Sequence, residues 1–202
     1  MEIEKFTFFY PEKPRMISSD GNLFDLLSKK REVVAEKKYN GIRLQLHFMP
    51  DGSFQFWNRH NVRLQYLPGQ ELSEAMDQLG LEGYNVLDGE LRHGKVKGVK
   101  HKIVLFDVFV FQNQLLVDKP FFYRRGLLEK LVYADNLQLV QQYRDNFRGV
   151  FEFVTREPEI EGLVLKNKTG YLDFGLKSGA LSKWMWKVRR PSKKQRFKTG
   201  LK

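Results

Sequence analysis

An alternating run of apolar and polar residues, followed by a tight turn, most constrains the fold of this chain. Ile42, Leu44, Leu46 and Phe48 alternate with Arg43, Gln45 and His47, and Asp51-Gly52 then precedes Phe54 and Phe56. Alternation with period two is typical of a β-strand, and Asp-Gly between two such runs favours a hairpin. The sequence therefore predicts an antiparallel strand pair over residues 42–56.

The rest of the chain mixes short strands with fewer helices. Apolar residues at helical spacing predict helices over residues 20–30, 72–79, 121–132 and 146–154. Further apolar runs predict strands over residues 84–91, 102–111, 162–166 and 184–188. Trp184 and Trp186, two residues apart on the last strand, are expected to share one face and pack in the core. Because helices and strands do not alternate regularly, we expect an α+β domain built on antiparallel sheet.

Composition narrows the class of protein. The 202 residues fit one generous domain, and 35 Lys plus Arg against 24 Asp plus Glu give a net charge of +11. This excess of positive charge favours a polyanionic partner, and nucleic acid is the first candidate. We expect no membrane partner. The absence of cysteine excludes disulfides and thiolate metal sites. With no apolar run of signal-peptide or membrane-span length, we expect an intracellular monomer in the cytoplasm or nucleoid, with a viral origin left open.

Five short motifs follow one another in the sequence. They are KYNGIR (Lys38 to Arg43), LDGEL (Leu87 to Leu91), LFDVF (Leu105 to Phe109), EGLVLK (Glu161 to Lys166) and WKVR (Trp186 to Arg189). Together they supply the carboxylates, the aromatic ring and the cations that a nucleophilic lysine needs. In this order and spacing, and with PFFYRRGLLEKL before the fourth motif, residues 37–189 resemble the adenylation domain of ATP-dependent DNA ligases, members of the covalent nucleotidyltransferase superfamily.

The resemblance implies a fold and a reaction. It implies an ATP-grasp-like adenylation domain over residues 1–189, with antiparallel sheets flanked by helices around a nucleotide cleft, and a basic tail over residues 190–202. In the family a lysine, here Lys38, attacks the α-phosphate of ATP, and AMP then passes to a 5′-phosphate at a nick in double-stranded DNA, which the 3′-hydroxyl seals. Only 13 residues follow Arg189, so we expect no OB-fold domain. Either the ligase is minimal, or a missing OB-fold domain or accessory clamp protein completes it.

The resemblance also assigns roles to residues. The expected catalytic residues are Lys38, Glu161, Lys166 and Lys187. Nucleotide contacts are expected from Lys37, Arg43, Arg59, Glu90, Phe106, Lys166 and Lys187, with Phe106 stacking on adenine. Glu161 and Glu90 are the expected ligands of Mg²⁺ or Mn²⁺. Nucleic-acid contacts are expected from Arg43, Arg59, Arg189, Arg190, Lys193 and Lys194.

Elementary chemistry supports these roles, and the sequence departs from the family pattern at three positions, one of them Asn58, which replaces a serine before Arg59. A free lysine has a pKa of about 10.4, so Lys38 needs nearby cations, such as Lys166, Lys187 or a metal, to lose its proton. Asn40 occupies the place of the usual aspartate, which keeps an acceptor oxygen but removes a charge. Arg189 takes the place of the last lysine and retains its charge.

Three other functions fit the same sequence. An RNA ligase would use the same motifs, and a GTP-using capping enzyme is a more distant alternative. A nucleic-acid binding protein of ligase type that has lost its chemistry is the third, for which Asn40 is the only indication.

Overall fold

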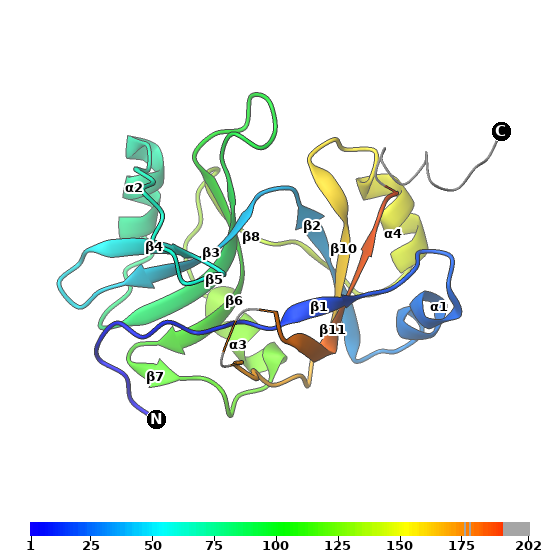
Figure 1. The fold of residues 1–202 in the computed structure, drawn as a ribbon, viewed down its shortest axis with the longest axis horizontal. Helices are drawn as coiled ribbons and strands as arrows, with labels where there is room; N and C mark the ends of the chain where they lie inside the picture. Colours follow the sequence, from blue (N-terminus) through cyan, green and yellow to red (C-terminus); the bar gives the residue numbers. More distant parts are fainter. Residues whose placement is uncertain (176, 178, 192–202) are drawn as a thin grey trace.

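The computed structural model describes residues 1–175, 177 and 179–191 of the 202-residue chain. Lys193 and Lys194, which the sequence analysis assigned to nucleic-acid binding, lie outside the described residues. Among the described residues, no helix is long and apolar enough to span a bilayer. The expected α+β class is confirmed, because two sheets, mostly antiparallel, carry four short helices on their faces (Figure 1).

The first sheet contains the predicted hairpin. It comprises β3 (Ile42–Phe48), β4 (Phe54–Asn58), β5 (Asn85–Arg92), β6 (Lys102–Phe111), β7 (Gln114–Leu115) and β8 (Leu137–Leu139). All neighbours are antiparallel except β6 and β8. Leu44 and Leu46 are fully buried and pack in one core with Leu72 and Met76 of α2 (Gln70–Asp77). Apolar alternation thus fixes which face of β3 meets the helix.

The second sheet forms the other half of the molecule. Its strand order is β1 (Lys13–Met16), β11 (Leu181–Arg189), β10 (Ile160–Asn167), β2 (Val33–Tyr39) and β9 (Gln142–Tyr143). Val33 and Ala35 of β2 join a core that includes Phe24 of α1 (Asn22–Ser28) and Phe147 of α4 (Phe147–Val154). The side chains at the intervening positions of β2 therefore point to the opposite face of this sheet.

An N-terminal arm, residues 1–12, crosses the first sheet and leads into β1 of the second (Figure 1). It covers the polar row of β3. The Phe9 N–H donates to Gln45 at 3.3 Å, the Gln45 amide donates to the Phe9 carbonyl at 2.5 Å, and Arg43 donates to the Glu12 carbonyl at 2.7 Å. His47 is buried beside the hydroxyl of Tyr84, which lies 2.7 Å from Nδ1. Both faces of β3 are therefore covered.

Two local predictions were wrong. α3 (Phe121–Leu128) ends four residues before the predicted Val132, because the chain turns and the Tyr133 hydroxyl donates to the terminal Leu128 carbonyl at 2.8 Å. Trp184 and Trp186 lie on opposite faces of β11 rather than on one. The hydroxyl of Ser182 accepts from the N–H groups of residues 184 and 185, in a stretch where the register between β1 and β11 shifts.

Candidate active site

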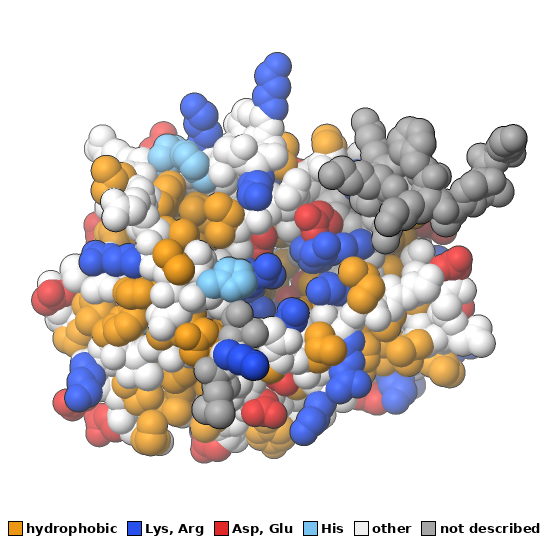
Figure 2. Space-filling view, in the orientation of Figure 1, with side chains coloured by type: hydrophobic (Ala, Val, Ile, Leu, Met, Phe, Trp, Pro, Cys, Tyr) orange, Lys and Arg blue, Asp and Glu red, His pale blue; other side chains and the backbone are white. Residues whose placement is uncertain are grey.

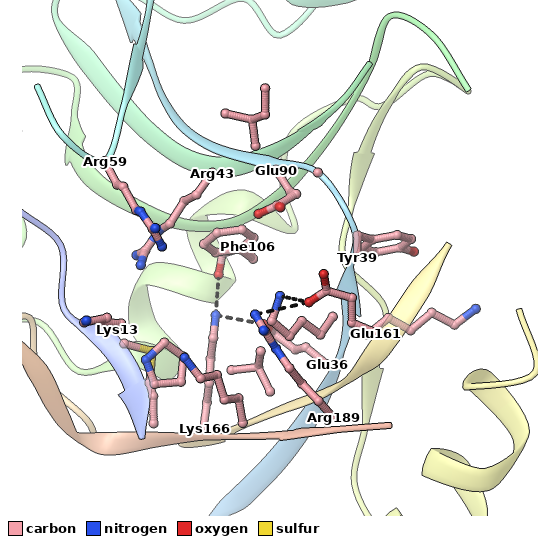
Figure 3. Close-up of a pocket in the computed structure, with 18 of the residues that line it drawn as sticks. Lys13, Glu36, Tyr39, Arg43, Arg59, Glu90, Phe106, Glu161, Lys166 and Arg189 are labelled. Carbon is pink, nitrogen blue, oxygen red and sulfur yellow. Dashed lines mark hydrogen bonds and ion pairs between the residues drawn. The ribbon is translucent and has the colours of Figure 1, made fainter. Parts of the chain in front are cut away.

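A pocket of about 380 Å³ opens between the two sheets. This volume falls within the range of small-molecule sites. Strands β2, β10 and β11 supply one wall, and β3, β5 and β6 supply the other. Lys and Arg side chains surround the hollow at its mouth (Figure 2), and acidic groups lie inside it (Figure 3). The pocket can therefore receive an anionic small molecule.

The alternation of β2 directs two neighbouring lysines to different partners. Lys38 lines the pocket, and its ammonium lies 2.6 Å from a carboxylate oxygen of Glu161. The Lys37 ammonium instead pairs with Glu157, which follows α4, at 3.1 Å. Burial lowers the pKa of Lys37, but the Glu157 carboxylate and nearby tyrosines outweigh this and raise it. Of the two, only Lys38 presents its amine to the carboxylate of the pocket.

An irregularity in β10 places Glu161 opposite Lys38. Ile160 pairs with Tyr39 and Gly162 pairs with Lys38, so Glu161 bulges out of the register between them. Gly162 has a φ of +154°, and a Cβ there would lie 2.0 Å from the Val188 carbonyl oxygen. Only glycine fits this position. Glu161 also forms an ion pair with Arg189 at 3.2 Å, so it bridges two cations.

The position of Glu90, on the facing wall, requires a glycine at position 41 of the first motif. A Cβ at Gly41 would lie 2.5 Å from the Leu91 carbonyl oxygen and 2.7 Å from Cγ of Glu90. The missing side chain thus lets β5 approach the turn after Lys38. Burial raises the pKa of Glu90 to about 7, while Lys38 and Arg43 act in the opposite direction. Near neutral pH this carboxyl group is therefore ready to ionise when a cation approaches.

Lys166 is an almost fully buried cation at the base of the pocket. Its ammonium lies 2.7 Å from a carboxylate oxygen of Glu36 and donates to the Phe106 carbonyl at 2.9 Å. It also lies 5.0 Å from the centre of the Phe106 ring. Two of its three donors are thus occupied, which leaves one for a bound anion. Phe106 itself is half-buried and lines the pocket.

Further cations give the pocket an excess of positive charge. Lys13, Arg59 and Lys187 all line it (Figure 3 labels the first two). Burial lowers the pKa of Lys187, and the charges of Arg189, Lys38, Lys13 and Arg59 lower it further. The described part of the chain places no carboxylate within ion-pair distance of Lys187 or Lys13. A bound polyanion would relieve this repulsion.

Known proteins resemble this chain over part of their sequence. No family model matches the chain. Two curated relatives, each called DNA ligase, are from Methanococcus aeolicus (24% identity over 186 residues, 79% of this chain and 33% of the relative) and fowlpox virus (24% over 193 residues, 83% and 34%). The chain thus spans about a third of the length of these relatives.

Solved structures share the architecture. The ligase domain of LigD from M. tuberculosis superposes with a TM-score of 0.63 at 19% identity, covering 87% of this chain and 60% of that one. The ATP-dependent DNA ligase of bacteriophage T7 gives 0.56 at 17% identity, covering 89% and 68%. The chain therefore shares the fold of these ligase structures. An archaeal ATP-dependent RNA ligase also shares it, with a TM-score of 0.54 at 16% identity over 90% of this chain and 48% of that one.

Within this ligase fold, the pocket brings together most of the expected residues. Its lining includes Lys38, Arg43, Arg59, Glu90, Phe106, Glu161, Lys166, Lys187 and Arg189. Four other expectations, for Lys37, Arg190, Arg43 and the metal site, stay predictions. Lys37 lines the pocket too, with its ammonium bound to Glu157, and its contact with the nucleotide stays a prediction. Arg190 donates to the Thr155 and Pro158 carbonyls, and its role toward nucleic acid stays a prediction.

Arg43 is already engaged within the ligase fold. Its guanidinium binds both carboxylate oxygens of Asp88, at 3.0 and 2.5 Å, besides the Glu12 carbonyl. Such a two-point contact fixes the group in place. Its position as a structural bridge is thus clear, whereas direct contact with nucleotide or DNA remains a prediction.

The metal site expected for a ligase also stays a prediction. Within the described ranges, no group of three or more acidic or histidine side chains could hold a metal ion. Glu161 and Glu90 nevertheless face one pocket, and Mg²⁺ is usually held by one or two carboxylates together with substrate phosphates. The donor set is therefore compatible with a metal that arrives with ATP.

Sequence reasoning missed several residues of the pocket, and three of them bear on its charge and shape. Glu36, two before Lys38, is the buried partner of Lys166. Its position on the same strand face as Lys38 was a usable signal. Tyr39 lines the rim and stacks under Arg92, whose guanidinium carbon lies 4.6 Å from the ring centre. Lys13 comes from the N-terminal segment, outside every motif, and no local pattern marks it.

Proposed function

We propose that the protein is an ATP-dependent DNA ligase, or its adenylation domain, with Lys38 as the residue that becomes adenylated. The observation that carries the proposal is the position of the Lys38 amine, 2.6 Å from Glu161 in a pocket that also contains Phe106, Lys166 and Lys187. The solved structures of a mycobacterial DNA ligase D and of the T7 ligase that share this fold are complexes with ATP.

The first step would form a bond between the Lys38 nitrogen and the α-phosphorus of ATP and break the bond from that phosphorus to the bridging oxygen. Glu161 holds the lysine in place but also stabilises its charged form, so the proton must leave as the bond forms. Lys187 and Arg189 add positive charge around the amine, which favours loss of that proton and stabilises the phosphate. Phe106 offers a ring to the adenine base.

Glu161 and Glu90 are the residues that would hold Mg²⁺ or Mn²⁺, which would neutralise charge on the phosphate oxygens. Burial keeps part of the Glu90 population protonated near pH 7. Its carboxyl group could then also bind a ribose hydroxyl, as the resemblance to ligases implies.

DNA is preferred over RNA as the nucleic-acid substrate. Both curated relatives are called DNA ligase, although RNA ligases share the fold. The net charge of +11 and the ring of cations at the pocket mouth suit either polyanion. The RNA ligase alternative is therefore kept as the second candidate.

The test uses the chain with radiolabelled nucleotides and nicked duplexes. We expect covalent label from ATP with the label on the α-phosphate, none from the γ-labelled form, and little from GTP. Sealing of a nick in DNA but not in RNA would support the proposed substrate, and the reverse would support the RNA ligase candidate. Absence of covalent label from ATP in the presence of Mg²⁺ or Mn²⁺ would contradict the proposal.

A further inference from the structure

The N-terminal arm and the start of β1 connect the two walls of the pocket. On one wall, the Glu12 carbonyl accepts from Arg43 at 2.7 Å. On the other wall, the Trp184 indole donates to the Glu12 carboxylate at 3.0 Å, and the Lys13 N–H donates to the Ala180 carbonyl at 2.8 Å. The backbone of Lys13 is therefore fixed at the point where the arm passes from one sheet to the other.

The side chain of Lys13 enters the pocket from this point. It belongs to the lining, and its ammonium lies 3.6 Å from where a Cβ on Gly179 would be. Within the described ranges no carboxylate pairs with Lys13, and its charge is among those that act on Lys187.

Most other cations of the pocket already have acidic partners. Lys38 and Arg189 share Glu161. Lys166 pairs with Glu36, and Arg43 pairs with Asp88. Lys13 is therefore among the cations most available to a ligand anion.

The position of Lys13 indicates which part of a bound nucleotide it would contact. Figure 3 shows Lys13 and Arg59 on the side of the pocket opposite Glu161. Lys38 attacks from the Glu161 side, because its amine lies 2.6 Å from that carboxylate. In phosphoryl and nucleotidyl transfer the attacking and leaving groups lie roughly in line with the phosphorus. The leaving group thus points toward Lys13 and Arg59.

We propose that Lys13 binds the pyrophosphate end of ATP and stabilises it as it leaves. This inference rests on the proposed function. When the bond between the Lys38 nitrogen and the α-phosphorus forms, the bond from that phosphorus to the bridging oxygen breaks, and the oxygen keeps the electron pair. The Lys38 ammonium loses one proton to become the attacking amine and a second as the phosphoramidate forms, and both protons go to solvent. The ammonium of Lys13 neutralises the charge that develops on the departing pyrophosphate.

The test compares Lys13→Gln with a matched control on the adjacent strand. Lys183→Gln removes the same charge from an exposed position of β11 outside the pocket lining. In Lys13→Gln we expect the KM for ATP, and the pyrophosphate concentration that half-reverses lysyl-AMP formation, to rise about tenfold. Transfer of AMP from the adenylated protein to nicked DNA should be unchanged. Lys183→Gln should match the wild type, and Lys13→Arg should recover most of the affinity.

Calorimetric titration with pyrophosphate separates this inference from the proposed function. If wild-type protein takes no label from ATP, the proposed function fails. The subsite is then judged from pyrophosphate binding alone, which Lys13→Gln should weaken about tenfold and Lys183→Gln should not. Equal pyrophosphate binding by wild type and a folded Lys13→Gln variant, or an equal KM for ATP, would overturn the inference.

Discussion

Lys38 of β2 and Glu161 of β10 form an ion pair of 2.6 Å across two neighbouring antiparallel strands. The pair exists because strand alternation directs Lys38 into the pocket and a bulge turns Glu161 toward it. A second ion pair of the same kind lies one residue earlier along β2, where the Lys37 ammonium is 3.1 Å from a carboxylate oxygen of Glu157. The two pairs have similar chemistry but different surroundings, which makes each the control for the other.

Replacing Glu161 by Gln should slow formation of lysyl-AMP about tenfold to a hundredfold. The amide keeps the shape but loses a charge-assisted hydrogen bond to Lys38, the proposed nucleophile, and a proposed ligand for the metal. Glu157→Gln removes the equivalent group from Lys37 and should leave the rate unchanged. The measurement is the single-turnover rate of label incorporation from ATP over a series of Mg²⁺ concentrations. Equal rates in both variants would show that Glu161 has no part in the step.

Glu90 should make the protein less stable as the pH rises from 5 to 8. Burial raises its pKa from 4.5 in the unfolded chain to about 7, so between these values the folded state binds more protons and its stability falls with pH. Glu90→Gln removes this term. Relative to the wild type, the variant should gain up to about 3 kcal/mol between pH 5 and pH 8. Urea denaturation at both pH values measures the difference, and a constant difference would refute the raised pKa.

Gly41→Ala should impair both stability and adenylation. The added Cβ would meet the Leu91 carbonyl oxygen at 2.5 Å and Glu90 Cγ at 2.7 Å, which forces β5 away from the turn after Lys38. We expect a loss of about 1–3 kcal/mol in stability. Gly126→Ala is the matched control, since that Cβ in α3 meets nothing within 4 Å and should stabilise the helix by about 0.5–1 kcal/mol. Thermal and urea denaturation compare them, and equal effects would argue against a special requirement at position 41.

Asp88→Ala should destabilise the protein by about 3 kcal/mol, because the half-buried guanidinium of Arg43 would lose both of its contacts with the buried Asp88 carboxylate. Asp25→Ala removes one partner of an exposed pair with Arg148 and should cost about 1 kcal/mol or less. Free energies of unfolding from urea titration test the contrast. A small effect at position 88 would mean that the N-terminal arm does not depend on the Arg43 bridge.

The sequence predicted much of the fold where periodicity is strong. The strand predicted over residues 102–111 has those bounds, and the helix predicted over 146–154 begins at its cap, Asn146. The N-terminal arm was missed, because its contacts join residues far apart in the chain, such as Phe9 with Gln45. Local sequence patterns do not predict contacts between residues so far apart in the chain. The faces of Trp184 and Trp186 were wrong for a related reason, since a bulge interrupts the alternation.

The candidate site was recovered for residues within motifs and less well for those outside them. Lys38, Glu90, Phe106 and Glu161 all line one pocket, as the order of the motifs indicated. Lys37 also lines the pocket, but its ammonium binds Glu157, so its contact with a nucleotide stays a prediction. Lys13 and Glu36 reach the pocket through tertiary contacts that a linear motif does not encode.

The intact mass of the protein after incubation with ATP and Mg²⁺ tests the central claim most directly. The account predicts a gain of one adenylate in the wild type and in Lys37→Ala, whose side chain lies on Glu157, and no gain in Lys38→Ala. Addition of pyrophosphate should reverse the gain. An adenylate that persists in Lys38→Ala, or one that disappears only in Lys37→Ala, would contradict the assignment of Lys38 as the nucleophile.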